Sequence, residues 1–282
     1  MIILKKRIII YGLIGLTVLI LLYVFMPKEI LMTPLMTPED FLASRPFMEL
    51  GNGWILIEPS SSLMVFLLGI QIFVMGLFLL RDNLTLWGWS LLFWSAGTIL
   101  AGISYQTFGY ELKCSGQAYC LFTSWFELAY LFTTAMSISL MAFAFAQRFT
   151  TNRTTKYLIG YGKIALVIYT VILVLGSILN NQLMISYELF TVFFMPLFLV
   201  FFIVNIVNYK TNKNSLDNAF IKLWLLFLFV NVAYYVYFFL GYTELLYDTT
   251  GIWFSANDVL HVALILWFVY LQLRVKKELI LK

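Results

Sequence analysis

Long apolar runs separated by short polar segments dominate the chain. A helix needs about 20 mainly apolar residues to cross the roughly 30 Å hydrocarbon core of a bilayer, because it rises about 1.5 Å per residue. In hydrocarbon, every backbone amide has to be paired within its own segment, so we expect helices rather than open strands. We count eight candidate spans: Ile8–Met26, Leu63–Leu80, Leu84–Tyr105, Trp125–Ala146, Leu158–Leu179, Tyr187–Val207, Phe220–Leu240 and Ile252–Leu273.

The composition agrees with a chain embedded in a membrane. Of its 282 residues, 62% are hydrophobic and 11% are charged, whereas a soluble domain carries about 25% charged residues. So few charges cannot cover the surface of a soluble domain of this length. This excludes a soluble enzyme, a nucleic-acid binder and a disordered tail. We therefore expect an all-α, polytopic membrane protein whose main partner is the lipid bilayer.

The Lys and Arg residues predict the orientation, because they accumulate on the cytoplasmic side of membrane proteins. With a cytoplasmic N-terminus, fifteen of the 18 fall on the cytoplasmic side, and only Lys28, Arg45 and Lys113 fall outside. Both termini are therefore predicted to be cytoplasmic. Acidic residues show the opposite bias, and those placed outside are Glu29, Glu39, Asp40, Glu49, Glu58, Glu111, Glu244 and Asp248.

The first span precedes a seven-span core. Residues 1–26 form either an uncleaved anchor or a secretory signal peptide. The apolar run is longer than a signal core of about 7–15 residues, and no small-residue cleavage site follows it, which favours the anchor. Residues 62–274 are then predicted to form a seven-helix bundle, and residues 275–282 a cytoplasmic tail.

Residues 27–61 are predicted to form an extracytoplasmic loop that contains five of the six prolines. Within it, Thr37-Pro38-Glu39-Asp40 is typical of a helix N-cap, with proline at the first helical position and acids in the first turn. We expect a short helix there, lying on the membrane surface through Phe41, Leu42 and Phe47. The loop is either a connector or a lid over the outer face of the core.

Both cysteines, Cys114 and Cys120, fall in the predicted extracytoplasmic connection between the third and fourth spans. An oxidising compartment permits a disulfide there, and two free thiols are the alternative. Two thiolates with no nearby histidine do not complete the four ligands of a zinc site.

The remaining proline, Pro196, lies in the middle of the sixth span. Proline removes one hydrogen bond from a helix, so a kink is expected at this point. Such a kink serves either helix packing alone or a hinge.

Ionisable residues within spans are costly, and they raise a functional hypothesis. Those of this chain lie in the fourth, sixth and eighth spans, which all run from outside to inside; Asp258 and His261 are expected about two to three turns into the eighth. The polar groups of these three spans therefore reach a similar depth in the outer half of the membrane. Two residues at the outer end of the third span reach the same depth. We predict one cavity that opens outward and is shared by Glu127, Glu188, Asp258, His261, Tyr105 and Gln106.

The start of the eighth span is the richest segment in chemistry. Ser255, Asp258 and His261 are spaced three apart, and Asn257 lies four residues before His261, so these side chains share a helix face. Asp258 is placed to orient His261 or accept its proton, and Ser255 is placed to bond to Asp258. Histidine titrates near neutral pH. The alternative is structural: an Asp258–His261 pair that holds helices together, with Glu127 paired to a Tyr or Gln.

The chain lacks the residues that several common cofactors need. The last span has no mid-span lysine for a retinal Schiff base, and the single histidine cannot ligate a haem on both sides. We therefore expect no cofactor and no metal. A hydrolase built from Ser255, Asp258 and His261 is disfavoured, because the nucleophile and its base would be about 9 Å apart along one helix.

The stretch Gly251-Ile-Trp-Phe-Ser-Ala-Asn-Asp-Val-Leu-His-Val, continuing to Arg274, resembles the last helix of bacterial seven-helix membrane proteins of unknown function. The segments from Ser104 to Lys113-Cys114, from Ser124 to Tyr130 and from Ile185 to Leu189 are similar to the same group. The resemblance implies a seven-helix fold in a bacterial inner membrane. A more distant likeness is to the alkaline ceramidase and progestin-receptor-like superfamily, whose zinc site uses three histidines; here only Asp258 and His261 match.

Three hypotheses follow for the function. The first is a binding or sensing protein that holds a small lipophilic ligand, or a proton, in the outward-facing pocket. The second is a membrane-embedded lipid hydrolase of ceramidase-like type. The third is a small transporter that uses the intramembrane acids for proton coupling.

Overall fold

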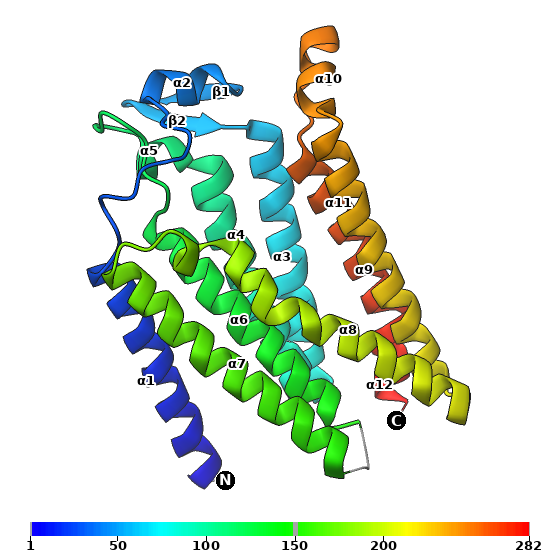
Figure 1. Cartoon of the computed structure of the whole chain (residues 1–282). Helices are drawn as coiled ribbons and strands as arrows, with labels where there is room; N and C mark the ends of the chain where they lie inside the picture. The colour runs from blue at the N-terminus through cyan, green and yellow to red at the C-terminus, as the bar shows by residue number, and fades with distance from the viewer. Residues whose placement is uncertain (1, 149–151, 282) are drawn as a thin grey trace.

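The computed structural model describes residues 2–148 and 152–281, with side chains described from 12 to 148 and from 153 to 281. Within these residues long helices lie side by side, with a small cap over one end (Figure 1). The long helices are α1 (Ile2–Val24), α3 (Pro59–Arg81), α4 (Thr85–Ala101), α6 (Trp125–Ala146), α7 (Asn152–Ile178), α8 (Tyr187–Asn212), α9 (Ser215–Phe239) and α11 (Ala256–Tyr270). The shorter elements are α2 (Pro38–Ala43), β1 (Phe47–Gly51), β2 (Trp54–Ile57), the π-helical turn η1 (Gly102–Thr107), α5 (Gly109–Lys113), the 3₁₀ turn η2 (Leu183–Ile185), α10 (Tyr242–Thr250), the π-helical turn η3 (Leu271–Val275) and α12 (Lys276–Ile280).

In the described part of the chain, seven helices are long and apolar enough to cross a membrane, which confirms the prediction of an apolar all-α bundle. α4 continues into η1, and α11 continues through η3 and α12, so each forms one long rod. α12 thus extends the last rod into the residues predicted as a tail. The described apolar part of α1 covers only Gly12–Val24, so the first predicted span, Ile8–Met26, stays a prediction, as do the sides on which the termini lie.

The helices pack in an order that differs from their order in the chain. α4 packs against α3 and α6, α6 packs against α7, and α11 packs between α3 and α9. α8 pairs with α9 and crosses diagonally back toward α6 (Figure 1). Small residues permit the closest approaches: a Cβ added at Gly88 of α4 would lie 3.0 Å from the carbonyl oxygen of Gly76 in α3. Because α4, α7 and α8 pack against α6, most of α6 is buried in the centre of the bundle.

The cap consists of residues 27–57 and 109–122. β1 and β2 form an antiparallel hairpin beside α2 and α5, and residues 30–36 run along the 120–122 segment through backbone hydrogen bonds. The hairpin was not predicted from the sequence. The predicted short helix is confirmed: Thr37 caps α2, and Asp40 returns the bond to the Thr37 backbone.

The interior of the cap is apolar and contains a disulfide. Cys114 and Cys120 are bonded to each other, as predicted, and both are fully buried against Phe41 and Ile57. The expectation that Phe41 lies on the membrane surface is wrong, because its ring is only 1% exposed and packs inside the cap. The loop therefore behaves as a folded cap rather than as an extended connector.

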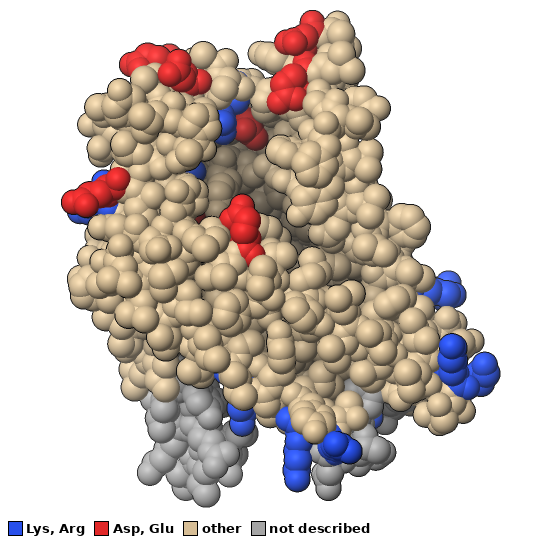
Figure 2. Space-filling view, viewed as in Figure 1, with Lys and Arg blue, Asp and Glu red and all other residues tan. Residues whose placement is uncertain are grey.

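Charges segregate to the two ends of the molecule. In Figure 2, Asp and Glu gather at the end that carries the cap and α10, whereas Lys and Arg gather at the opposite end. This distribution agrees with the bias of the sequence.

Candidate functional site

The surface is hollowed between the cap and α10, above the first half of α8 (Figure 2). Acidic and basic side chains lie inside this hollow and at its rim. The predicted site residues belong to the same end of the bundle, since they occupy the first turns of α6, α8 and α11 and the last turn of the α4 rod. The hydrogen bonds among the described residues divide them into two separate clusters.

The first, the outer cluster, consists of Arg45, Glu58, Ser61, Ser255 and Asp258. Asp258 is fully buried, and its Oδ2 accepts hydrogen bonds from the Ser61 hydroxyl at 2.9 Å and from the Ser255 backbone N–H at 2.7 Å. The Ser255 hydroxyl oxygen in turn accepts from the Asp258 backbone N–H at 3.2 Å. Within the described structure, Asp258 Oδ1 has no hydrogen-bond partner. This carboxylate therefore joins α3 to α11 and keeps one acceptor oxygen unused.

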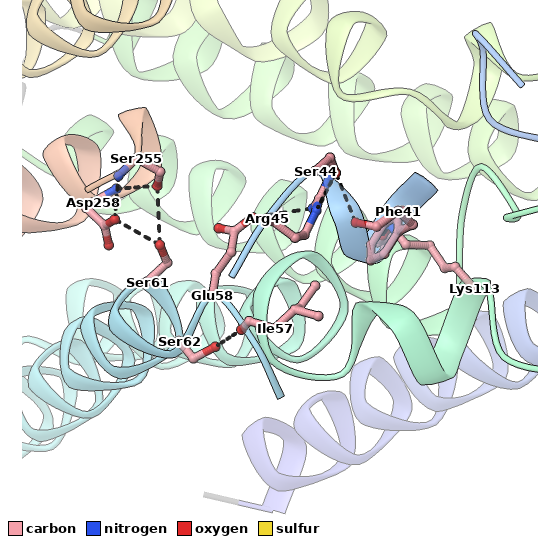
Figure 3. A network of polar contacts seen from close by, with 11 residues as sticks. Phe41, Ser44, Arg45, Ile57, Glu58, Ser61, Ser62, Lys113, Ser255 and Asp258 are labelled. Atoms are coloured by element: carbon pink, nitrogen blue, oxygen red, sulfur yellow. Dashed lines mark hydrogen bonds and ion pairs between the residues drawn. The ribbon is translucent and has the colours of Figure 1, made fainter. Parts of the chain in front are cut away.

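Glu58 and Arg45 extend the outer cluster toward the cap. In Figure 3, Glu58 lies between Arg45 on one side and the Ser61–Asp258 pair on the other. Arg45 Nη1 lies 3.3 Å from Glu58 Oε1, and its guanidinium stacks 4.1 Å above the Phe41 ring. Glu58 adopts a left-handed backbone with a φ of +44°, a strained conformation for a residue other than glycine. The fold thus holds a second carboxyl close to Asp258.

Burial sets the protonation properties of this pair. Burial raises the pKa of the Glu58 carboxyl; the Arg45 charge opposes the rise and the Asp258 charge adds to it. Burial also lowers the pKa of the Arg45 guanidinium, and Glu58 partly restores it. The Glu58 carboxyl therefore holds a proton more readily than an exposed glutamate does.

The eighth predicted span needs a correction. We expected the helix to begin near Ile252, but α11 begins at Ala256, and α10 is a separate helix before it. Ser255 is the N-cap and Asp258 the third residue of the helix, so the prediction that these polar groups lie two to three turns inside it is wrong for Asp258. His261 is one turn deeper and only 8% exposed.

The predicted pairing of Asp258 with His261 is not among the hydrogen bonds of the described residues. His261 Nδ1 has no partner in this part of the chain, and Asn257 is half-buried. The bond predicted between Ser255 and Asp258 is present, but it takes the form of a reciprocal cap of the helix start.

The second cluster, which we call the Lys113 cluster, consists of Ser104, Lys113, Ser124 and Glu127. Glu127 Oε1 accepts from Lys113 Nζ at 2.8 Å and from the Ser104 hydroxyl at 2.9 Å, and both charged side chains are almost fully buried. The Lys113 ammonium also lies 5.2 Å from the centre of the Tyr105 ring. Glu127 is therefore paired with a lysine of the cap, and the expected Tyr or Gln partner is wrong.

Two other predicted residues lie at this level without joining either cluster. Glu188 is exposed in the first turn of α8 and forms no ion pair within the described residues. Gln106 lies in η1, is 4% exposed, and its Oε1 is unpartnered in the described structure. π-Helical turns are common at functional sites, because they redirect side chains locally. Within this turn, the Tyr105 side chain is partly exposed, whereas the Gln106 side chain is buried.

A common local cause explains why the acids share one depth. Serines cap three helices: Ser124 at α6, Ser186 at α8 and Ser255 at α11. Each cap is followed two or three residues later by an acid. Acids favour this position because they compensate the unpaired N–H groups and the positive end of the helix dipole. The shared depth is therefore a property of helix starts, and it does not by itself require a shared cavity.

Sequence reasoning missed a third buried ion pair, at the basic end. Arg148 Nη2 lies 3.0 Å from Asp217 Oδ1, and Arg148 Nη1 donates to Asn205 Oδ1 at 3.3 Å. This contact ties the end of α6 to α8 and α9. The sequence signal is Asn214 followed three residues later by Asp217, which matches an N-cap and a first-turn acid and places the helix start before the predicted Phe220.

No group of three or more His, Cys, Asp or Glu side chains able to hold a metal occurs among the described residues. Comparison of the chain with protein-family models, curated proteins and solved structures found no match. In the part of the chain that it describes, the structure establishes a helical bundle with seven long apolar helices, a disulfide-bonded cap and two buried polar clusters beneath it.

Proposed function

We propose that the chain is an integral protein of a bacterial inner membrane that binds a small lipophilic ligand in the hollow beneath its cap. The observation that carries this proposal is the hollow of Figure 2, which contains charged side chains at the end of an otherwise apolar bundle. Ligand sites are typically concave and mostly apolar, with a few convergent polar groups. The bacterial membrane rests on the resemblance of residues 251–274.

The charges favour a ligand whose polar head donates hydrogen bonds. Four of the acids at this end lie at helix starts (Glu58, Glu127, Glu188 and Asp258), and two of these four are compensated by Arg45 and Lys113. Asp258 keeps an acceptor oxygen without a partner in the described structure. An amine or hydroxyl head satisfies such an acceptor, and an apolar chain fits the surrounding helices. A proton on Glu58 is the alternative occupant, since burial raises the pKa of that carboxyl.

Binding of simple amphiphiles to the purified full chain tests the proposal. Dodecylamine, dodecanol and dodecanoate share one chain and differ only in the head, and native mass spectrometry counts the bound molecules. We expect dodecylamine to saturate at one per chain and dodecanoate to bind weakest. Asp258→Asn should weaken dodecylamine binding about tenfold, because a hydrogen bond to a charged group contributes about 1.5–3 kcal/mol.

Asp248→Asn is the matched control, because Asp248 is an exposed acid of α10 at the same end of the molecule. It should leave dodecylamine binding unchanged. The absence of saturable binding for all three amphiphiles would contradict the proposal. Equal losses in the two variants would place the ligand elsewhere than the outer cluster.

A further inference from the structure

A second recess lies between α7 and α8, away from the cap. It has a volume of about 540 Å³ and is open on its outer side. Ile164 of α7 and Leu197 and Val200 of α8 make its apolar floor, and Lys156 and Thr154 lie at the end near the start of α7. The recess is part of neither the outer cluster nor the Lys113 cluster.

Two glycines of α7 show how the recess forms. Gly162 faces α6, where an added Cβ would lie 3.0 Å from the Phe143 ring and 3.3 Å from Ala142. Gly160 faces the recess, and an added Cβ there would meet nothing within 4 Å. On the opposite wall, Pro196 contributes only a compact ring. The Tyr161 hydroxyl donates to the Phe193 carbonyl at 2.7 Å, and this bond fixes α7 against α8 beside the recess.

The charge at one end of the recess is positive and uncompensated. Lys156 and Arg153 are both exposed, and no carboxylate of the described residues lies within 4.0 Å of either side chain. The Arg153 guanidinium lies 5.8 Å from the Tyr157 ring, which also borders the recess. An apolar trough with cations at one end complements an amphiphile with an anionic head. Basic pockets between membrane helices bind anionic phospholipid heads for this reason.

We propose that the recess between α7 and α8 binds one phospholipid with an anionic head. The phosphate lies against Lys156 and Thr154, and an acyl chain lies along Ile164, Leu197 and Val200. The site is independent of the ligand proposed for the hollow, because no residue is common to the two. A helix of another protein is the competing occupant, but an apolar helix does not compensate the cations.

Lipid titration of the purified full chain, followed by native mass spectrometry, tests this site. The probes are phosphatidylglycerol and phosphatidylcholine with identical acyl chains. We expect phosphatidylglycerol to bind several-fold more tightly. Lys156→Gln should weaken phosphatidylglycerol about fivefold and leave phosphatidylcholine unchanged, because one basic residue contributes about that factor near an anionic surface. Lys163→Gln, which removes an exposed charge that does not border the recess, should change neither.

Filling the recess gives a second, independent arm. Gly160→Leu should displace both lipids, while Gly15→Leu, which fills open space on α1, should displace neither. Equal affinity of the wild type for the two lipids overturns the proposal. So does unchanged binding in Lys156→Gln, or a Gly160→Leu variant that alters oligomeric state without altering lipid binding. Failure of dodecylamine to bind would concern only the hollow, since that assay does not report on this recess.

Discussion

The Ser61 hydroxyl of α3 donates a 2.9 Å hydrogen bond to the Asp258 carboxylate of α11, across 197 positions of the sequence. Both residues are fully buried. The bond fastens the first helix of the core to the last one at the end that carries the cap. It also removes one lone pair of Asp258 from the reach of any ligand.

Ser61→Ala should destabilise the protein by about 1.5–3 kcal/mol, the range for a hydrogen bond to a charged group. The measurement is the free energy of unfolding in detergent. Ser60→Ala is the control, because the neighbouring Ser60 is exposed and makes only a 3.4 Å contact with the Trp253 carbonyl. Equal losses in the two variants would show that the buried bond to Asp258 is not what stabilises this contact.

Glu58 should make stability depend on pH in a defined direction. Burial raises the pKa of Glu58 above its ordinary 4.5, so the folded state holds the proton more tightly than the unfolded state. Its contribution is therefore fully present below about pH 4.5 and is lost as the pH rises through the folded-state pKa. The charged groups that act on it are Arg45, which opposes the rise, and Asp258, which adds to it.

Glu58→Gln should accordingly flatten the pH dependence of the melting temperature above pH 4.5, relative to the wild type. Glu49→Gln provides the matched change at an exposed acid of the cap and should leave the profile as it is. The prediction would be contradicted if the wild-type melting temperature rose above pH 4.5 and Glu58→Gln abolished that rise. Folding would then lower the pKa of Glu58 instead of raising it.

Lys113 and Glu127 should behave as one energetic unit. Removing one partner of a buried ion pair leaves an uncompensated charge and costs about 3–5 kcal/mol. Lys113→Met and Glu127→Gln should each lower the free energy of unfolding by such an amount, and the double variant should lose much less than the sum. Glu188→Gln, at an exposed acid of α8, should have little effect. Strict additivity in the cycle would refute the pairing.

The sequence predicts the helices well, because the length of an apolar run needed in hydrocarbon is set by the bilayer alone. It predicts the start of α11 less well. Trp253 and Phe254 are apolar, so they extend the predicted run toward the N-terminus. The capping box of Ser255 and Asp258 makes the helix begin only after them. The sequence spacing of Ser255 and Asp258 already matches a capping box. Giving that signal more weight than hydropathy would have placed the boundary correctly.

The buried pairs lie beyond what one sequence reveals. Arg45 and Lys113 fall in predicted loops, where charged residues are usually solvated, and only the folding of the cap over the bundle buries them. The hairpin, in contrast, carried a readable signal. Its turn is Asn52-Gly53 between two apolar segments, and both residues adopt positive φ. The long Pro-rich stretch around it obscured that pattern.

The disulfide gives the last prediction, because it closes the segment that presents Lys113 to Glu127. Cys114 follows Lys113 directly, and the Leu121 backbone N–H donates to the Lys113 carbonyl at 2.8 Å. Closing a loop of this length stabilises a fold by about 2 kcal/mol in the chain-entropy description. Reduction with dithiothreitol should therefore lower the wild-type melting temperature and speed amide exchange of Leu121. Dithiothreitol should not change the melting temperature of a variant that carries both Cys114→Ala and Cys120→Ala. An equal shift in that variant would show that the reductant does not act through the disulfide.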